Sequence, residues 1–262
     1  MKLLVHLHLF YEDMLEQMFS YLNNLQDFHY DLFVSLVCRN NEIEKKIKYL
    51  QPNAKIIYVD NKGFDVYPFI VVLNTVDIDE YNYVIKIHTK RNLDKAVVLH
   101  GKYYIASGGY WREKLLCFLE SKDNFKTAIE LLHNEDVGMV SHYKLIDDEI
   151  GECNESRALN LLNEIGLTLN KKRFVMGTMF VCKAELLKPL KRLYYEFEVI
   201  DSMNVKNRTR DGLLAHVYER LFGWIIYSQN KKIVPLYYPN IKERIVNFIM
   251  VKILKYKKYI VK

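Results

Sequence analysis

Short apolar runs alternate with longer amphipathic stretches along the first ninety residues. Residues 3–10, 30–37 and 55–59 are apolar, as is a fourth run that begins at Tyr83. Runs of this length are typical of buried strands. Between them, residues 12–25 and 41–50 place apolar side chains at helical spacing. The order strand, helix, strand, helix predicts a mostly parallel sheet with helices on both faces.

The second half is less regular. Residues 111–119 and 123–132 are predicted helices, 137–141 a strand, and 184–197 a helix that Pro189 kinks or breaks. Residues 174–182 are predicted as one strand, in which Gly177 indicates a bulge or a close approach. The polar, acidic stretch 144–170 is more typical of an insertion or flap than of core.

Two further segments end the chain. Residues 211–223 form the last strong helical pattern, with Asp211 expected at its N-cap and Gly223 near its C-terminal end. Residues 241–262 combine seven Lys or Arg with apolar and aromatic side chains. This tail fits an amphipathic helix on an anionic membrane surface, or a terminal helix docked on the domain with a solvated basic face. We therefore divide the chain into residues 1–240 and 241–262.

The stretch from Asn61 to Phe69 is the first candidate site. It joins the apolar runs 56–59 and 70–73 and predicts strand, turn and helix. Asn61, Lys62 or Gly63 can supply a positive φ angle, and Asp65 is expected to cap the helix, whose first turn tolerates Pro68. In open α/β sheets, ligands sit at the loop after a strand's carboxyl end. A well-capped turn without a ligand is the alternative.

Donor groups collect where the strand from Tyr83 ends. They are Lys86, His88, Thr89, Lys90 and Arg91. Because side chains alternate along a strand, Lys86, His88 and Lys90 are expected on the same face of it. This arrangement predicts a binding site for a pyrophosphate. The alternative is a solvated charge run, although Lys86 lies inside an apolar strand.

Two histidines in the first strand, His6 and His8, lie two residues apart and so face the same side. The favoured interpretation is a pair of hydrogen-bonded core histidines. A ligand-binding role is the alternative.

Composition narrows the classes of function. The chain has 262 residues, half of them hydrophobic, enough for a large core. The formal net charge of +6 permits an anionic partner, but no nucleic-acid-binding signature is present, and we expect no nucleic-acid partner. The four cysteines form no CxxC pair, which favours a reducing, cytosolic setting. The N-terminus does not match a signal peptide. No apolar window reaches the roughly 18 residues that a membrane-spanning helix needs.

An acidic cluster in the 144–170 stretch could in principle bind a metal ion. It comprises Asp147, Asp148, Glu149 and Glu152. Its spacing matches no calcium loop, so a solvated face is favoured.

Taken together, six stretches resemble the rhamnan synthesis protein F family of bacterial polysaccharide glycosyltransferases. They are His6–Tyr11, Asn61–Phe69, Lys86–Lys90, Trp111–Glu113, Gly177–Phe180 and Asp211–Gly223. They occur in the family's order and span nearly the whole chain. The chain departs from the pattern at Val181, where an aromatic residue is expected, and at Leu213, where Thr is common.

The resemblance implies a GT-A-like, Rossmann-like α/β domain. It also implies transfer of rhamnose or a related hexose from a nucleotide-sugar donor to a lipid-linked saccharide acceptor. Such an enzyme would work at the cytoplasmic face of a membrane, peripherally attached, in the synthesis of cell-wall, capsule or O-antigen polysaccharide of lipopolysaccharide.

The implied reaction assigns roles to the candidate residues. Asp211 is the first choice for general base and Glu219 the second. The donor site is expected to contain His8, Asn61, Gly63, Asp65, Lys86, His88, Thr89 and Lys90. Gly177 and Thr178 are expected in the acceptor or sugar pocket. Most GT-A enzymes hold a divalent cation, Mg²⁺ or Mn²⁺, with an Asp-x-Asp motif. No such motif follows the strand from Tyr83, so cationic side chains are expected to carry part or all of the charge neutralisation.

A second hypothesis is a non-catalytic protein. In that case a GT-A-like domain docks on a membrane polysaccharide-assembly complex through its basic tail and turns over nothing. The missing Asp-x-Asp motif favours this hypothesis, whereas the polar groups at the predicted strand ends favour the enzyme.

Overall fold

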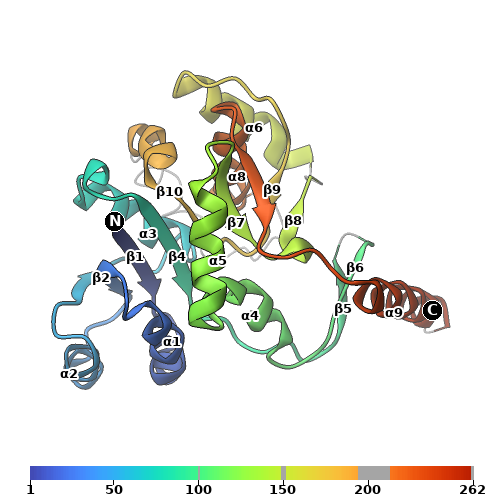
Figure 1. Cartoon of the computed structure of the whole chain (residues 1–262), viewed down its shortest axis with the longest axis horizontal. Coiled ribbons are helices and arrows are strands. Elements are labelled where there is room, and N and C mark those ends of the chain that lie inside the picture. The colour runs from blue at the N-terminus through green and yellow to red at the C-terminus, as the bar shows by residue number, and fades with distance from the viewer. Residues whose placement is uncertain (100, 149–151, 194–212, 261–262) are drawn as a thin grey trace.

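A computed structural model describes residues 1–99, 101–148, 152–193 and 213–260. Its described residues form a seven-stranded sheet in the order β11, β7, β10, β4, β1, β2, β3 (Figure 1). The strands are β1 Lys2–His8, β2 His29–Leu36, β3 Lys55–Tyr58, β4 Tyr83–His88, β7 Val137–Ser141, β10 Phe180–Lys183 and β11 Lys232–Pro235. All neighbours pair in parallel except β10, which runs antiparallel to both β4 and β7. The expected α/β fold with a mostly parallel sheet is confirmed.

Helices connect the strands and cover both faces of the sheet. They are α1 Leu15–Leu22, α2 Asn41–Leu50, α3 Val66–Thr75, α4 Tyr110–Leu115, α5 Lys122–His133, α6 Glu152–Glu164, α8 Leu214–Ser228 and α9 Ile241–Ile260. Short 3₁₀ turns add η1 Glu12–Met14, η2 Asn23–Leu25, η3 Ile78–Glu80, η4 Cys117–Leu119, η5 Tyr143–Leu145 and η6 Ala184–Leu193. α5 lies against β7 and β10, α3 lies against β1, and η6 lies against β4. No described helix is long and apolar enough to cross a membrane.

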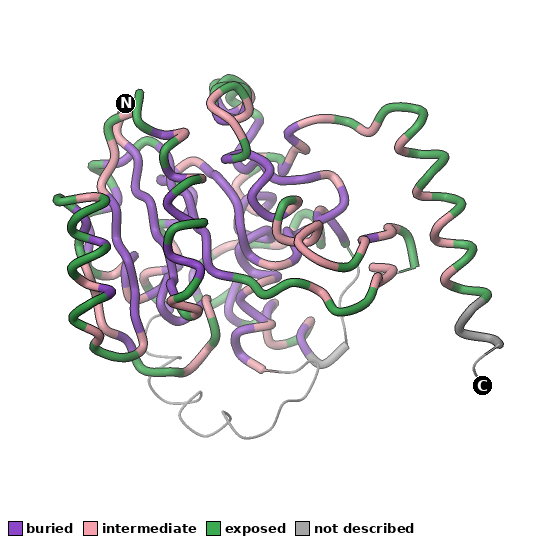
Figure 2. Tube along the Cα trace, turned by 90° about the horizontal axis from the view of Figure 1, so that it is seen from below, coloured by how far each residue is buried: buried purple, intermediate pink, exposed green. Residues whose placement is uncertain are grey.

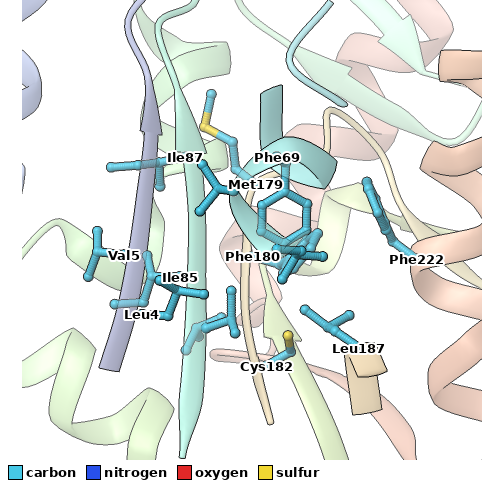
Figure 3. Close-up of a cluster of buried hydrophobic side chains, with 14 of the residues drawn as sticks. Leu4, Val5, Phe69, Ile85, Ile87, Met179, Phe180, Cys182, Leu187 and Phe222 are labelled. Carbon is cyan, nitrogen blue, oxygen red and sulfur yellow. The ribbon is translucent and has the colours of Figure 1, made fainter. Parts of the chain in front are cut away.

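Aromatic rings from three elements lie within the mainly aliphatic core beside the candidate site (Figure 3). Phe69 of α3 meets Phe180 of β10 and Phe222 of α8 edge-on, with ring centroids 6.2 and 5.6 Å apart. All three side chains are at most 2% exposed, and burying each contributes about 2–3 kcal/mol of stability. The three rings therefore fix α3 and α8 against the sheet and set the position of the loops that precede these helices.

The single strand expected at 174–182 is wrong. The segment forms two short strands, β9 Phe174–Val175 and β10, separated by a turn. Gly177 and Thr178 in this turn both adopt positive φ angles, +77° and +54°. A Cβ atom on Gly177 would lie 2.5 Å from Leu115 Cδ2. The glycine thus marks a close approach to α4 and a change of sheet, since β9 pairs with β8 (Ile146–Asp147) instead of joining the main sheet.

The helix end expected at Gly223 is also wrong, because α8 continues to Ser228. Gly223 lies in mid-helix, where an added Cβ would be 2.4 Å from the Arg173 carbonyl oxygen and from Phe174 Cα. Close packing against β9, not helix termination, accounts for this glycine.

The described part of the 144–170 stretch packs into the core through α6 and is not a flap, whereas Glu149 of the acidic cluster lies outside the described residues. Ala158, Leu161, Leu162 and Ile165 are buried in the main hydrophobic cluster, on or just after α6, which packs on α8. The expected solvated acidic face is wrong for Asp147, which is 3% exposed and accepts a hydrogen bond from Lys102 at 3.0 Å.

Candidate active site

The candidate site lies at the carboxyl ends of β1 and β4, the two central strands. β1 pairs with β2 on one side and β4 on the other, so the connection order reverses direction at this point. Open α/β sheets bind ligands in the crevice at such a reversal. His8 and His88, the last residues of the two strands, are direct neighbours in the register. Thr89 joins the strand ends, because its Oγ1 accepts hydrogen bonds from Phe10 N at 3.1 Å and Tyr11 N at 2.9 Å.

Lys86 is the centre of a buried polar network. Its side chain is fully buried, and Nζ donates to Asp65 Oδ2 at 2.5 Å, Thr178 O at 3.0 Å and Thr178 Oγ1 at 2.9 Å. Thr178 Oγ1 also donates to Asp65 Oδ2. An ammonium has three donors, and all three of Lys86 have protein acceptors. Lys86 therefore ties the 61–65 loop to the 177–178 turn.

Asp65 does not cap α3 as expected. It stands at the N-cap position, but its side chain makes no capping hydrogen bond. Burial raises the pKa of its carboxyl, yet the electrostatic interactions with the His88 ring and with the Lys86 ammonium, together with the hydrogen bonds from Lys86 and Thr178, outweigh that effect. The pKa of Asp65 is consequently held well below its ordinary value, and the carboxylate is ionised at neutral pH. The Asp65 side chain thus bonds Lys86 and does not cap the N-terminus of α3.

The histidines of the site are neutral at pH 7. Desolvation by burial lowers the pKa of His88 to about 3 and that of His8 to about 4, and it lowers the pKa of His6 well below its ordinary value. His88 Nδ1 lies 3.4 Å from Asp65 Oδ2. Because its imidazole is uncharged, His88 adds a polar group to the strand end but no positive charge for a pyrophosphate.

Ser35 of β2 explains the paired histidines. His6 Nε2 and His8 Nδ1 lie 2.8 and 2.9 Å from the same Ser35 Oγ. All three residues are at most 3% exposed. The favoured interpretation of hydrogen-bonded core histidines is confirmed. The sequence contained no signal for Ser35, because a serine in an apolar strand has no distinctive spacing.

Two loops beside the network contain consecutive residues with left-handed backbone. Gly63 and Phe64 have φ angles of 60° and 52°, and Gly177 and Thr178 of 77° and 54°. The positive φ expected near Gly63 is confirmed, whereas that of Phe64 was not expected. Such backbone costs a residue with a side chain about 1 kcal/mol or more and is concentrated at ligand sites. Phe64 is 59% exposed and stacks on His216 with ring centroids 5.9 Å apart.

Glu219 of α8 holds the second of these loops. Its Oε1 accepts a hydrogen bond from Gly177 N at 2.7 Å, and its Oε2 accepts one from Arg220 Nη1 at 2.7 Å. Both carboxylate oxygens thus face protein donors. This arrangement assigns Glu219 a positioning contact with the 177–178 turn.

The structure brings together most of the predicted site residues. His8, Asp65, Lys86, His88, Thr89, Gly177, Thr178 and Glu219 form one connected group. Asn61 and Lys90 are exposed at its rim, and Gly63 is half-buried. Arg91 points elsewhere and forms a two-bond ion pair with Asp13, with distances of 2.6 and 2.8 Å. Asp211 lies outside the described residues.

A divalent cation does not fit those side chains of this site that the structure describes. Within the described part of the chain, no three His, Cys, Asp or Glu side chains come together as metal ligands. The Asp65 oxygen that faces the site's core is already shared by Lys86 and Thr178. We therefore assign no step of the reaction to a metal ion.

Comparison with known proteins places the chain in a family. The family model for rhamnan synthesis protein F matches residues 1–231, and the chain belongs to this family. The resemblance inferred from the six sequence stretches is thereby confirmed.

Two similar proteins are both described as uncharacterized protein WxcX of Xanthomonas campestris pv. campestris. They are 23% identical (strain B100) and 22% identical (strain ATCC 33913) over 234 residues, which cover 87% of this chain. The chain spans 32% of the length of these relatives. Among solved structures, the crystal structure of S. aureus TarS 1-349 matches with 16% identity and a TM-score of 0.36, over 72% of this chain and 48% of that one.

Proposed function

We propose that this chain is a glycosyltransferase domain of the GT-A type that acts in bacterial polysaccharide synthesis. The observation that carries the proposal is the Lys86–Asp65–Thr178 network beneath the carboxyl ends of β1 and β4. This network supports two left-handed loops at the place where α/β sheets bind nucleotides. Membership of the rhamnan synthesis protein F family supplies the link to polysaccharide.

In this proposal the donor is a nucleotide sugar and lies over the 61–65 loop. Asn61, Gly63 and the exposed ring of Phe64 contact the nucleoside or sugar. Lys90, exposed beyond the end of β4, meets the diphosphate together with the neutral imidazole of His88. Lys86 does not contact the donor in this proposal, since its N–H groups already bond Asp65 and Thr178. It lies beneath the donor site and holds these two residues in place.

The acceptor hydroxyl must lose its proton during transfer. We assign this step to Asp211, because both oxygens of Glu219, the other candidate, accept hydrogen bonds from protein donors. We also propose that Gly177 and Thr178 border the acceptor or sugar pocket, that the acceptor is a lipid-linked saccharide, and that transfer of rhamnose or a related hexose takes place on the cytoplasmic side of a membrane.

Thermal unfolding with a panel of nucleoside diphosphates and nucleotide sugars tests the proposal. At a ligand concentration about 100 times Kd, a bound nucleotide stabilises the protein by about 2.7 kcal/mol and raises Tm by several degrees. At least one member of the panel is expected to do so. A panel without any shift would contradict the proposal and favour the non-catalytic docking protein.

Two activity measurements refine the mechanism once a donor is identified. Asp211→Asn is expected to lower kcat on the order of 10²-fold or more while donor binding is kept. Transfer is expected to persist in the presence of a chelator. Near wild-type turnover of Asp211→Asn removes Asp211 from the mechanism, and activity lost with a chelator and restored by Mn²⁺ or Mg²⁺ overturns charge neutralisation by side chains.

A further inference from the structure

Helix α9 stands at one side of the molecule (Figure 2), beyond the β5–β6 hairpin labelled in Figure 1. The hairpin strands, β5 Val97–Leu99 and β6 Tyr103–Ile105, are the elements it packs against. Asn247 fixes the helix there, because its Oδ1 accepts from Tyr104 N at 2.8 Å and its Nδ2 donates to Lys102 O at 2.9 Å. None of residues 241–256 is buried.

The face of α9 opposite Asn247 is apolar, the reverse of an ordinary docked helix. Ile245, Ile249, Ile253 and Tyr256 recur at intervals of four, four and three residues and so form one stripe. Their exposed fractions are 53%, 48%, 42% and 74%. A monomeric domain rarely leaves such a continuous stripe in water, so the stripe marks an interaction surface.

The charge of the chain is concentrated in the same segment. Residues 241–262 contain seven Lys or Arg and one acidic residue, a net charge of +6, which equals the formal net charge of the whole chain. Residues 1–240 are therefore neutral overall. Along the helix, Lys242, Arg244 and Lys252 are exposed, and Lys252 Nζ lies 4.3 Å from the centre of the Phe248 ring. A cation beside an aromatic ring suits the boundary between headgroups and acyl chains.

We propose that α9 binds in the plane of an anionic lipid bilayer. Ile245, Ile249 and Ile253 enter the acyl boundary, and the Lys and Arg side chains contact headgroup phosphates. An apolar stripe flanked by cations is the pattern of interfacial helices, and the positive charge complements anionic lipid. This surface is separate from the candidate active site, so the proposal holds or fails independently of sugar transfer.

Co-sedimentation of the full chain with vesicles tests this proposal. Vesicles of phosphatidylglycerol and phosphatidylcholine in equal parts are expected to bind at least about 10-fold more tightly than phosphatidylcholine alone, with affinity falling as salt rises. The double variant Ile249→Ser with Ile253→Ser removes apolar contact, and Lys242→Gln with Lys252→Gln removes charge. Each is expected to weaken binding about 10-fold or more.

Matched controls lie on the body of the domain. Tyr49 is 87% exposed, and Lys45 and Lys46 are exposed on α2. Tyr49→Ser and the pair Lys45→Gln with Lys46→Gln are expected to bind vesicles like the wild type. Absence of binding to the anionic vesicles, or equal losses in the controls, overturns the proposal. So does a dimer in light scattering that Ile249→Ser with Ile253→Ser dissociates while vesicles have no effect, because the stripe is then an interface between two copies.

Discussion

Lys86 Nζ lies 2.5 Å from Asp65 Oδ2, although the two residues are 21 positions apart and belong to different elements. Lys86 projects from the middle of β4, and Asp65 precedes α3. The pair joins the central strand to the loop proposed to hold the donor. A buried lysine would be costly alone, so its retention depends on the acceptors that Asp65 and Thr178 provide.

Replacing the cation exposes this dependence. Lys86→Met keeps the length of the side chain but leaves Asp65 without its main partner. We expect the free energy of unfolding to fall by about 3 kcal/mol, as measured by urea denaturation. In the double variant with Asp65→Asn, part of that loss is expected to return because the unpaired carboxylate is gone. Additive losses would show that the two side chains are not coupled.

A variant of Phe64, whose backbone is left-handed, tests whether its side chain contacts the donor or only adds backbone strain. Phe64→Gly removes the positive-φ penalty but also the ring and some backbone restraint, so we expect stability to change by less than about 1 kcal/mol. Donor affinity is expected to fall about 10-fold, measured by calorimetry, because the exposed ring is lost. Asn230→Gly is the control, since Asn230 has φ 59° and lies outside the site. Equal donor affinity in both variants would remove Phe64 from the site.

The lowered pKa of His8 predicts an acid-sensitive fold. Its pKa is about 4 in the folded chain and about 6.5 when unfolded, so the unfolded state binds more protons between these values. Stability contributed by neutral His8 is present above about pH 6.5 and is lost as pH falls toward 4. In His8→Asn, the slope of unfolding free energy against pH near pH 5 is expected to decrease by about 1.4 kcal/mol per pH unit. An unchanged slope would mean that His8 is accessible to protons in the folded state.

Variants of Glu219 test whether this carboxylate positions the 177–178 turn or acts as the general base. Glu219→Gln keeps an oxygen for Gly177 N, so kcat is expected to stay within about 5-fold of wild type, whereas Glu219→Ala releases the turn and raises the donor or acceptor KM. Steady-state kinetics of the two variants provide the test. A loss on the order of 10²-fold in kcat for Glu219→Gln, with KM unchanged, would instead make Glu219 the base.

Periodicity predicted the first half of the fold well, because each strand and helix there is an uninterrupted local pattern. The second half of the fold was harder to predict from the sequence, because contacts between distant residues determine its structure. Gly177 and Gly223 are determined by contacts with Leu115 and with Phe174, which are distant in sequence. A glycine therefore looks like a bulge or a helix end when only its neighbours are known. Likewise α6 is buried by α8, and a polar composition concealed its apolar face.

The site was predicted as a set of residues but not as a network. Alternation correctly placed Lys86 and His88 on one side of β4, where both meet Asp65. The charge of each group depends on burial, which spacing does not encode. The sequence predicted that Lys86, His88 and Lys90 together bind a diphosphate as cations. His88 is neutral and Lys86 is paired with Asp65 and Thr178, so Lys90 is the one of these three residues left to provide positive charge.

A crystal structure of the chain with a bound nucleoside diphosphate tests the central claim most directly. We predict the diphosphate beside His88 and Lys90, with the nucleoside over residues 61–65 and the Lys86–Asp65 pair intact beneath it. A nucleotide bound elsewhere on the molecule, or one that displaces Asp65 to bond Lys86 itself, would contradict the account.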